Sequence, residues 1–220
     1  MQAPQETDPG RPDAAPAAAP AAKLTRKGQA TRDRILAAAA GLMHERGVAG
    51  TSTEDVQLAA GVNPSQLYYY FKDKRALVAA VIAYQTESVV GCQELSRLDS
   101  VEALRAWRDF AVQLQHDKQF VGGCPIGSLG SELAEADDLA RGLLAAAFAR
   151  WQAAIRAGLR DMQERGELPP GPRADPDKLG LAVLAALQGG LLLTKVRRDT
   201  LALEAALDTT LDQIESLIVR

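Results

Sequence analysis

The sequence predicts an all-α protein. Only 5% of the 220 residues are aromatic while Ala and Leu are abundant, a composition that favours helix over strand. After Thr31, apolar side chains recur at three- and four-residue steps, and no useful length alternates at period two. With 47% apolar residues the chain is long enough to bury a sizeable core. We therefore expect about nine helices, arranged as an amino-terminal group of three followed by a larger carboxy-terminal helical domain.

Residues 1–24 are predicted to be a disordered tail rich in Ala and Pro. Five of the eleven prolines fall within the first 22 residues, and such a stretch has too little to bury to offset its ordering entropy. A partner-binding segment is the alternative interpretation. From Thr31 an apolar stripe predicts a first helix that ends near Gly47. The stripe consists of Ile35, Leu36, Ala39, Leu42 and Met43.

Two short helices follow, each with a strong start signal. Ser52 is a side-chain cap, and Asp55 stands three residues later as in a capping box. Val56 and Ala59 are expected to face inward on this second helix, which Gly61 ends.

The third helix is expected over residues 65–71. Asn63 caps it, Pro64 fits the first helical position, and Gln66 occupies the reciprocal position of a second capping box. Leu67 and Phe71 share one face.

Six more helices are predicted in the rest of the chain. Gly122, Gly123 and Pro125 mark one break, and the loop 166–176 is rich in Gly and Pro. Asp175 with Pro176 begins the penultimate helix, and Thr200 is expected to cap the last one. The predicted ranges are 74–96, 101–116, 126–134, 138–165, 176–198 and 201–219.

Charge is distributed unevenly along the chain. The net charge is −3, but residues 23–80 hold nine Lys and Arg against five acids, whereas residues 81–220 hold fifteen against twenty. A basic segment joined to an acidic remainder indicates that one end of the molecule meets a polyanion.

The two short helices have the layout of a helix-turn-helix. Such a unit needs apolar facing positions, a sharp turn such as Gly61 supplies, and hydrogen-bonding side chains at the start of the second helix, where Ser65, Gln66 and Tyr69 stand. Thr53, Tyr68, Tyr70 and Lys74 are suitable phosphate donors on its flanks.

The run of residues 50–77 resembles the DNA-binding signature of TetR-family repressors, and the resemblance covers residues 29–82. It rests on Ala60-Gly61-Val62 at the turn, Leu67-Tyr68 with Phe71 in the second short helix, and Lys74 with Leu77 after it. By resemblance, Thr53, Tyr68, Tyr70 and Lys74 contact phosphates while Gln66 and Tyr69 enter the major groove. The full set of expected DNA-binding residues is Thr53, Glu54, Asn63, Ser65, Gln66, Tyr68, Tyr69, Tyr70, Lys72 and Lys74.

Two points about this set remain open in the sequence. Glu54 either accepts a hydrogen bond from a cytosine amino group or simply favours the dipole of its helix as a first-turn acid. Three consecutive tyrosines cannot all point inward, because neighbours differ by about 100° around a helix axis. We expect Tyr69 and Tyr70 to be exposed and Tyr68 to share ring burial.

The resemblance implies residues 25–74 as a DNA-binding domain and residues 75–220 as a domain that binds a small-molecule effector and dimerises. The penultimate helix is apolar nearly all round, as burial on more than one side requires, although a central helix of a monomer is the alternative. The expected dimer residues are Ala182, Ala186, Gly190, Leu203, Leu207, Leu211 and Ile214.

An effector pocket needs apolar walls and a few polar anchors. The pocket candidates are Trp107, Phe110, Leu114, Cys124, Phe148, Trp151 and Gln188. The segment around Cys124 resembles one in a subgroup related to the LmrA and YxaF repressors. Cys124 is either an oxidant sensor or a buried structural thiol, and no evident cationic neighbour lowers its pKa.

Other function classes find little support. We expect no catalytic residues, no metal site and no cofactor, because the sequence has no Gly-rich phosphate loop, no nucleophile–base pair at a recognisable spacing, and only two Cys and two His. No apolar run of membrane-spanning length and no secretory signal is recognised, so a cytoplasmic protein is expected. The leading hypothesis is a homodimeric repressor that binds a pseudo-palindromic operator in double-stranded DNA. An enzyme that uses the apolar cavity and an interaction module that does not bind DNA are the alternatives.

Overall fold

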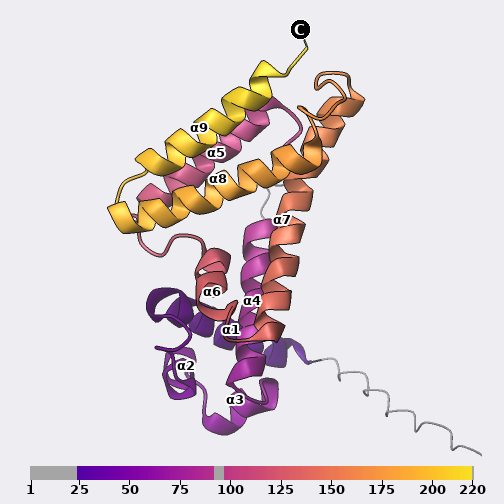
Figure 1. The fold of residues 1–220 in the computed structure, drawn as a ribbon. Coiled ribbons are helices and arrows are strands. Elements are labelled where there is room, and N and C mark those ends of the chain that lie inside the picture. The colour runs from indigo at the N-terminus through magenta and orange to yellow at the C-terminus, as the bar shows by residue number, and fades with distance from the viewer. Residues whose placement is uncertain (1–23, 92–96, 220) are drawn as a thin grey trace, which may run out of the picture.

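The computed structural model describes residues 24–91 and 97–219, which form nine helices and no strand (Figure 1). The all-α prediction is confirmed for this part of the chain. Nearly all of the predicted tail, and the predicted extension of one helix to Ser96, lie outside the described residues. The helices are α1 Arg26–Arg46, α2 Thr53–Ala60, α3 Pro64–Tyr70, α4 Lys74–Val90, α5 Val101–Asp117, α6 Pro125–Leu133, α7 Asp138–Glu164, α8 Pro176–Arg197 and α9 Leu201–Ser216.

The start of α1 and the capping of α9 differ from the prediction. The first helix begins at Arg26 rather than near Thr31, because the Thr25 hydroxyl accepts a hydrogen bond from the Gly28 N–H at 3.2 Å and caps an additional turn. Thr200 is the N-cap residue of α9 as expected, but its side chain does not cap the helix, because its hydroxyl donates to Glu204 instead. Asp199 Oδ1 accepts from the first N–H of α9, at 3.1 Å.

The helices form two ends joined by two long helices. Figure 1 shows α1, α2 and α3 at one end and α5, α8 and α9 at the other, with α4 and α7 running between them. On the distal side, Arg108 makes two hydrogen bonds of 2.8 Å to Asp208, which join α5 to α9. The first three helices therefore lie apart from the bundle of α5, α8 and α9, and another molecule can reach them there.

One buried apolar core runs through both ends, and two glycines allow its closest approaches. A Cβ on Gly158 of α7 would stand 1.9 Å from the Leu98 carbonyl oxygen. A Cβ on Gly190 of α8 would stand 2.6 Å from the Leu203 Cα of α9. Both neighbours are backbone atoms that cannot rotate away, so a side chain at either glycine would push α7 away from Leu98 or α8 away from α9.

Candidate nucleic-acid interface and internal cavities

The two short helices α2 and α3 are each fixed by a complete capping box. Ser52 accepts from the Asp55 N–H at 3.1 Å while the Asp55 carboxylate accepts from the Ser52 N–H at 2.9 Å. Asn63 Oδ1 accepts from the Gln66 N–H at 2.8 Å, and Gln66 Oε1 accepts from the Asn63 N–H at 3.0 Å. The Ser52 hydroxyl and N–H lower the pKa of Asp55. Both boxes predicted from the sequence are confirmed.

The packing of α2 against its neighbours differs from the prediction at one position. Val56 and Ala60 of α2 are buried, whereas Ala59, which was expected to face inward, is exposed. Val56 and Ala60 are four residues apart and share a face, and Ala59 is rotated away from it. Arg34 of α1, which the sequence analysis missed, donates from Nε to the Ala60 carbonyl at 2.9 Å and satisfies the end of α2.

Two of the three tyrosines of α3 differ from the prediction in their exposure. Tyr69 is 73% exposed as expected, but Tyr68 is 48% exposed and Tyr70 is half-buried, the reverse of the prediction for those two. Leu67 and Phe71 define the buried face, and Tyr70 lies three residues from Leu67 on the same side. The Tyr70 ring contacts the Tyr69 ring edge-on, with centroids 5.0 Å apart.

Most of the other predicted DNA-binding residues lie at the surface of this end. Ser65, Gln66, Asn63, Lys72 and Glu54 are exposed, and Thr53 and Lys74 are half-buried. The Thr53 hydroxyl donates to Glu54 Oε2 at 3.2 Å at the first turn of α2. An exposed α3 with polar side chains at its start can enter a major groove, and the flanking donors can reach phosphates.

Two polar contacts join this end to the rest of the molecule, and neither was predicted. The carboxylate of Glu132, near the end of α6, accepts from the N–H groups of Val48 and Ala49 at 2.8 and 2.7 Å. Arg75, in the first turn of α4, donates two hydrogen bonds of 2.8 and 2.9 Å to Asp137, which caps α7. Arg75 lowers the pKa of Asp137 to about 2. The turn after α1 is thus held against α6, and the start of α4 is held against the start of α7.

A cavity of about 280 Å³, here called the inner cavity, lies among α4, α5, α7 and α8. Its walls are largely apolar and include five of the seven predicted pocket residues. Phe148 and Gln188 do not line it; they line a second hollow on the other side of a wall that contains Cys124 and Leu191. The five residues brought together are Trp107, Phe110, Leu114, Cys124 and Trp151.

Cys124 is the N-cap of α6 and is buried between the two hollows. Its thiol sulfur accepts from the Gly127 N–H at 3.3 Å. Burial raises the pKa of the Cys124 thiol, which disfavours the reactive thiolate. This environment supports the interpretation as a structural thiol. Within residues 24–91 and 97–219, no group of three potential metal ligands comes together.

Most of the expected dimer residues are buried within this chain and are not accessible to a second chain. Leu203, Leu207, Leu211 and Ile214 of α9 are at most 1% exposed, because they pack inside this chain. Gly190 is buried against Leu203, and of the seven residues only Ala182 is exposed, with Ala186 half-buried. The large apolar side chains that do reach the surface here are Leu181, Leu192, Leu193 and Val196 of α8 and Leu201 of α9.

The helix α8 has enough length and hydropathy to cross a membrane. In the fold it packs against α7 and α9 and buries 44% of its most apolar window. Its composition is that of a core helix with one additional apolar face at the surface.

Comparison with known proteins assigns both parts of the chain. Residues 35–81 match the family described as bacterial regulatory proteins, tetR family, and residues 100–210 match the tetracyclin repressor-like C-terminal domain. An uncharacterised HTH-type transcriptional regulator in the lacX 3′ region of Lactococcus lactis is 31% identical over 187 residues, 81% of this chain and 90% of the relative.

Solved structures agree with the family match. A TetR transcriptional regulator from Chloroflexus aurantiacus superimposes with a TM-score of 0.75 at 28% identity, over 88% of this chain and 98% of its own. SmeT, described as the repressor of the Stenotrophomonas maltophilia multidrug efflux pump SmeDEF, was solved in complex with triclosan. That complex has a TM-score of 0.67 and 27% identity, and the match covers 87% of this chain and 93% of SmeT.

Proposed function

Because the chain belongs to the TetR family of transcriptional regulators, which bind DNA through a helix-turn-helix and are not enzymes, we propose that it is a repressor released from its operator by a small apolar effector. The observation that carries this proposal is the pairing of an exposed, doubly capped α3 with the inner cavity. The predicted boundary between the DNA-binding and effector domains, after Lys74, is kept as part of the proposal.

Base recognition would fall to the exposed start of α3. Gln66 Oε1 is held by the Asn63 N–H, so its free Nε2 is left to donate to an acceptor in the major groove, such as N7 or O6 of guanine or O4 of thymine. Tyr69, the most exposed tyrosine, lies one turn further along the same helix. The remaining predicted residues would fix the register through phosphates: Thr53, Asn63, Ser65, Tyr68, Lys72 and Lys74. Tyr70 is half-buried and would offer at most its hydroxyl, and Glu54 would act through the dipole of α2.

The effector would occupy the inner cavity. Trp107, Phe110, Leu114 and Trp151 give it apolar walls, and the Gln115 Oε1, buried without a hydrogen-bond partner in the described chain, gives it a polar anchor. Binding of triclosan by SmeT, a relative of the same fold, supports an effector that is small and largely apolar. The Phe148 and Gln188 predictions are not part of this proposal.

Homodimerisation would use the exposed apolar face of α8. Leu181, Ala185, Gly189, Leu192 and Val196 follow one another at three- and four-residue steps and are all exposed. Leu192→Glu places a charge at this face, so we expect a monomer in analytical ultracentrifugation. Leu139→Glu is the matched control, because Leu139 of α7 is 50% exposed and Leu192 60%. If both variants were monomeric, or if both remained dimeric, this choice of face would be contradicted.

Selection of genomic DNA fragments by the intact protein tests the central proposal. We expect one pseudo-palindromic sequence to be enriched, and affinity for it to fall steeply as salt concentration rises. Lys72→Met should weaken binding to every sequence, whereas Tyr69→Ala should change the sequence preference. Retention of fragments without any common sequence would refute a specific repressor.

A further inference from the structure

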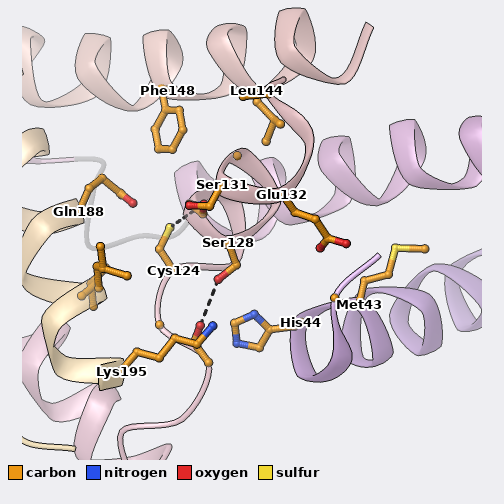
Figure 2. Close-up of a pocket in the computed structure, with 18 of the residues that line it drawn as sticks. Met43, His44, Cys124, Ser128, Ser131, Glu132, Leu144, Phe148, Gln188 and Lys195 are labelled. Carbon is orange, nitrogen blue, oxygen red and sulfur yellow. Dashed lines mark hydrogen bonds between the residues drawn. The ribbon is translucent and has the colours of Figure 1, made fainter. Parts of the chain in front are cut away.

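A second hollow, here called the junction cleft, lies between the end of α1 and the helices α6, α7 and α8 (Figure 2). Its volume is about 890 Å³, and it shares only Gly123, Cys124 and Leu191 with the inner cavity. Unlike the inner cavity, it is lined by residues of the DNA-binding end, from Met43 to Gly47. The two hollows are therefore different sites, separated by one wall.

One end of the junction cleft is positively charged. Figure 2 shows Lys195 of α8 and His44 of α1 on the same side of the cleft. Lys195 makes no ion pair within the described chain, and His44 Nδ1 is buried there without a hydrogen-bond partner. Burial, followed by the charges of Lys118 and Lys195, lowers the pKa of His44. This end therefore has an unneutralised ammonium group beside an unsatisfied imidazole.

The acidic side chains that line the cleft do not neutralise this end. Both carboxylate oxygens of Glu132 accept from backbone N–H groups of the α1–α2 turn. Glu45 lies 3.9 Å from its neighbour Arg46 and is mostly exposed. Arg141, a further cation at the cleft, is 2.6 Å from Asp138. Among the charged side chains that line the cleft, Glu132 and Lys195 make no ion pair within the described residues, but Glu132 is held by backbone N–H groups whereas the Lys195 ammonium has no such partner.

The other end of the cleft is apolar and contains one unpartnered donor. Phe148 and Leu144 of α7 lie there, across from Gln188 of α8 (Figure 2). The Gln188 Nε2 is buried with no hydrogen-bond partner in the described residues. Gln188 and Lys195 are seven residues apart, which places them on one face of α8 at a separation of roughly 10 Å along its axis.

We propose that the junction cleft is a second binding site, for a carboxylate that carries an apolar body. The carboxylate accepts hydrogen bonds from Lys195 and from His44, and the body extends past Leu191 toward Leu144 and Phe148. A single polar atom at the far end of the molecule can accept from Gln188 Nε2. Burial of the apolar body supplies most of the affinity, and Lys195 supplies the preference for an anion.

Occupation of this site brings the ligand against both domains at once. Met43 and His44 belong to α1, and Glu132, which holds the α1–α2 turn, stands in the same wall. The site is thus independent of the inner cavity and of the effector proposed for it.

Calorimetric titration of the full-length protein with decanoate tests the site, because decanoate joins one carboxylate for Lys195 to an apolar chain that can extend toward Leu144 and Phe148. We expect decanoate to bind more tightly than decanol and decylammonium not to bind. Lys195→Met should weaken the binding of decanoate about tenfold, which corresponds to the loss of one charge-assisted hydrogen bond, and should leave the affinity for decanol unchanged. Lys178→Met, an exposed lysine near the other end of α8, is the matched control and should change neither.

Two tryptophan variants and the methionine methyl resonances in NMR spectra test where decanoate binds. Ser131→Trp fills the junction cleft and should abolish decanoate binding, whereas Ser88→Trp narrows the inner cavity and should leave it intact. Decanoate should shift the Met43 methyl resonance of the wild-type protein and not that of Met162, which is buried away from both hollows. Equal affinity for decanoate and decanol, no binding, or loss through Ser88→Trp alone would each overturn the proposal. None of these results depends on whether an operator or inner-cavity effector is found.

Discussion

Removal of the Glu132 carboxylate should loosen the contact between the DNA-binding end and α6. Its two hydrogen bonds, of 2.8 Å to the Val48 N–H and 2.7 Å to the Ala49 N–H, are both charge-assisted. Such bonds contribute about 1.5–3 kcal/mol each where water cannot replace them. The Ala49 bond is exposed and the Val48 bond is part-buried, so water compensates the first in Glu132→Ala but not the second. The expected loss of unfolding free energy is about 2–3 kcal/mol.

Thermal unfolding followed by circular dichroism measures this loss. For a chain of this length 1 kcal/mol corresponds to about 2–4 °C, so the midpoint should fall by roughly 4–12 °C. Glu132→Gln keeps one acceptor oxygen, so its unfolding midpoint should fall by less. Glu135→Ala is the control, an exposed acid just beyond the same helix. Faster amide exchange at Val48 and Ala49 should accompany the loss. Equal midpoints for Glu132→Ala and Glu135→Ala would refute the assignment of a stabilising contact.

Three further predictions concern packing, pH and base recognition. Gly158→Ala should lower the urea midpoint, because its Cβ would stand 1.9 Å from the Leu98 carbonyl oxygen; Gly142→Ala, with nothing within 4 Å, should raise it, and the opposite order would be inconsistent with the packing. Because the folded pKa of Asp137 is about 2, below its usual value of 3.8, its contribution to stability is present above about pH 4 and is lost as the pH falls toward 2. Asp137→Asn should flatten the acid limb of the stability profile and Asp161→Asn, on an exposed residue of α7, should not. Gln66→Glu keeps the acceptor for the Asn63 N–H, so it should retain thermal stability while changing the preferred operator. Gln66→Ala should lose both the thermal stability and the wild-type operator preference. An unchanged operator preference in these variants would exclude Gln66 from base contact.

The local features of the DNA-binding end could be predicted from the sequence because they depend on residues three positions apart. The capping boxes of Ser52 with Asp55 and Asn63 with Gln66 are of this kind, and both form as expected. Which tyrosine of α3 faces inward depends on how the whole helix is rotated against its neighbours. Leu67 and Phe71 fix that rotation, and counting from them places Tyr70 rather than Tyr68 toward the core.

Contacts between distant segments left no signal in the sequence. Glu132 and Val48 are 84 residues apart, and no local pattern in the sequence pairs them. The pocket residues show the same limit. The predicted pocket residues could be chosen for their chemistry, but only the packing decides which hollow each one lines. Phe148 and Gln188 lie on one side of the wall that contains Cys124 and Leu191, and Trp107, Phe110, Leu114 and Trp151 lie on the other.

The dimer face that we propose follows from a comparison of α8 with α9 that periodicity alone does not make. The helix α9 has one apolar stripe, Leu203, Leu207, Leu211 and Ile214, and a helix with a single stripe buries it in its own chain. The helix α8 is apolar on more than one side, so after Leu187, Gly190 and Leu191 are covered by α7 and α9, a second stripe with Leu192 and Val196 remains at the surface. The small residue Gly190 serves the contact with α9 rather than with a second chain. In an all-α regulator of this kind, the helix with excess apolar surface is therefore the one to test for self-association, and the amphipathic helix beside it is the one that completes the fold.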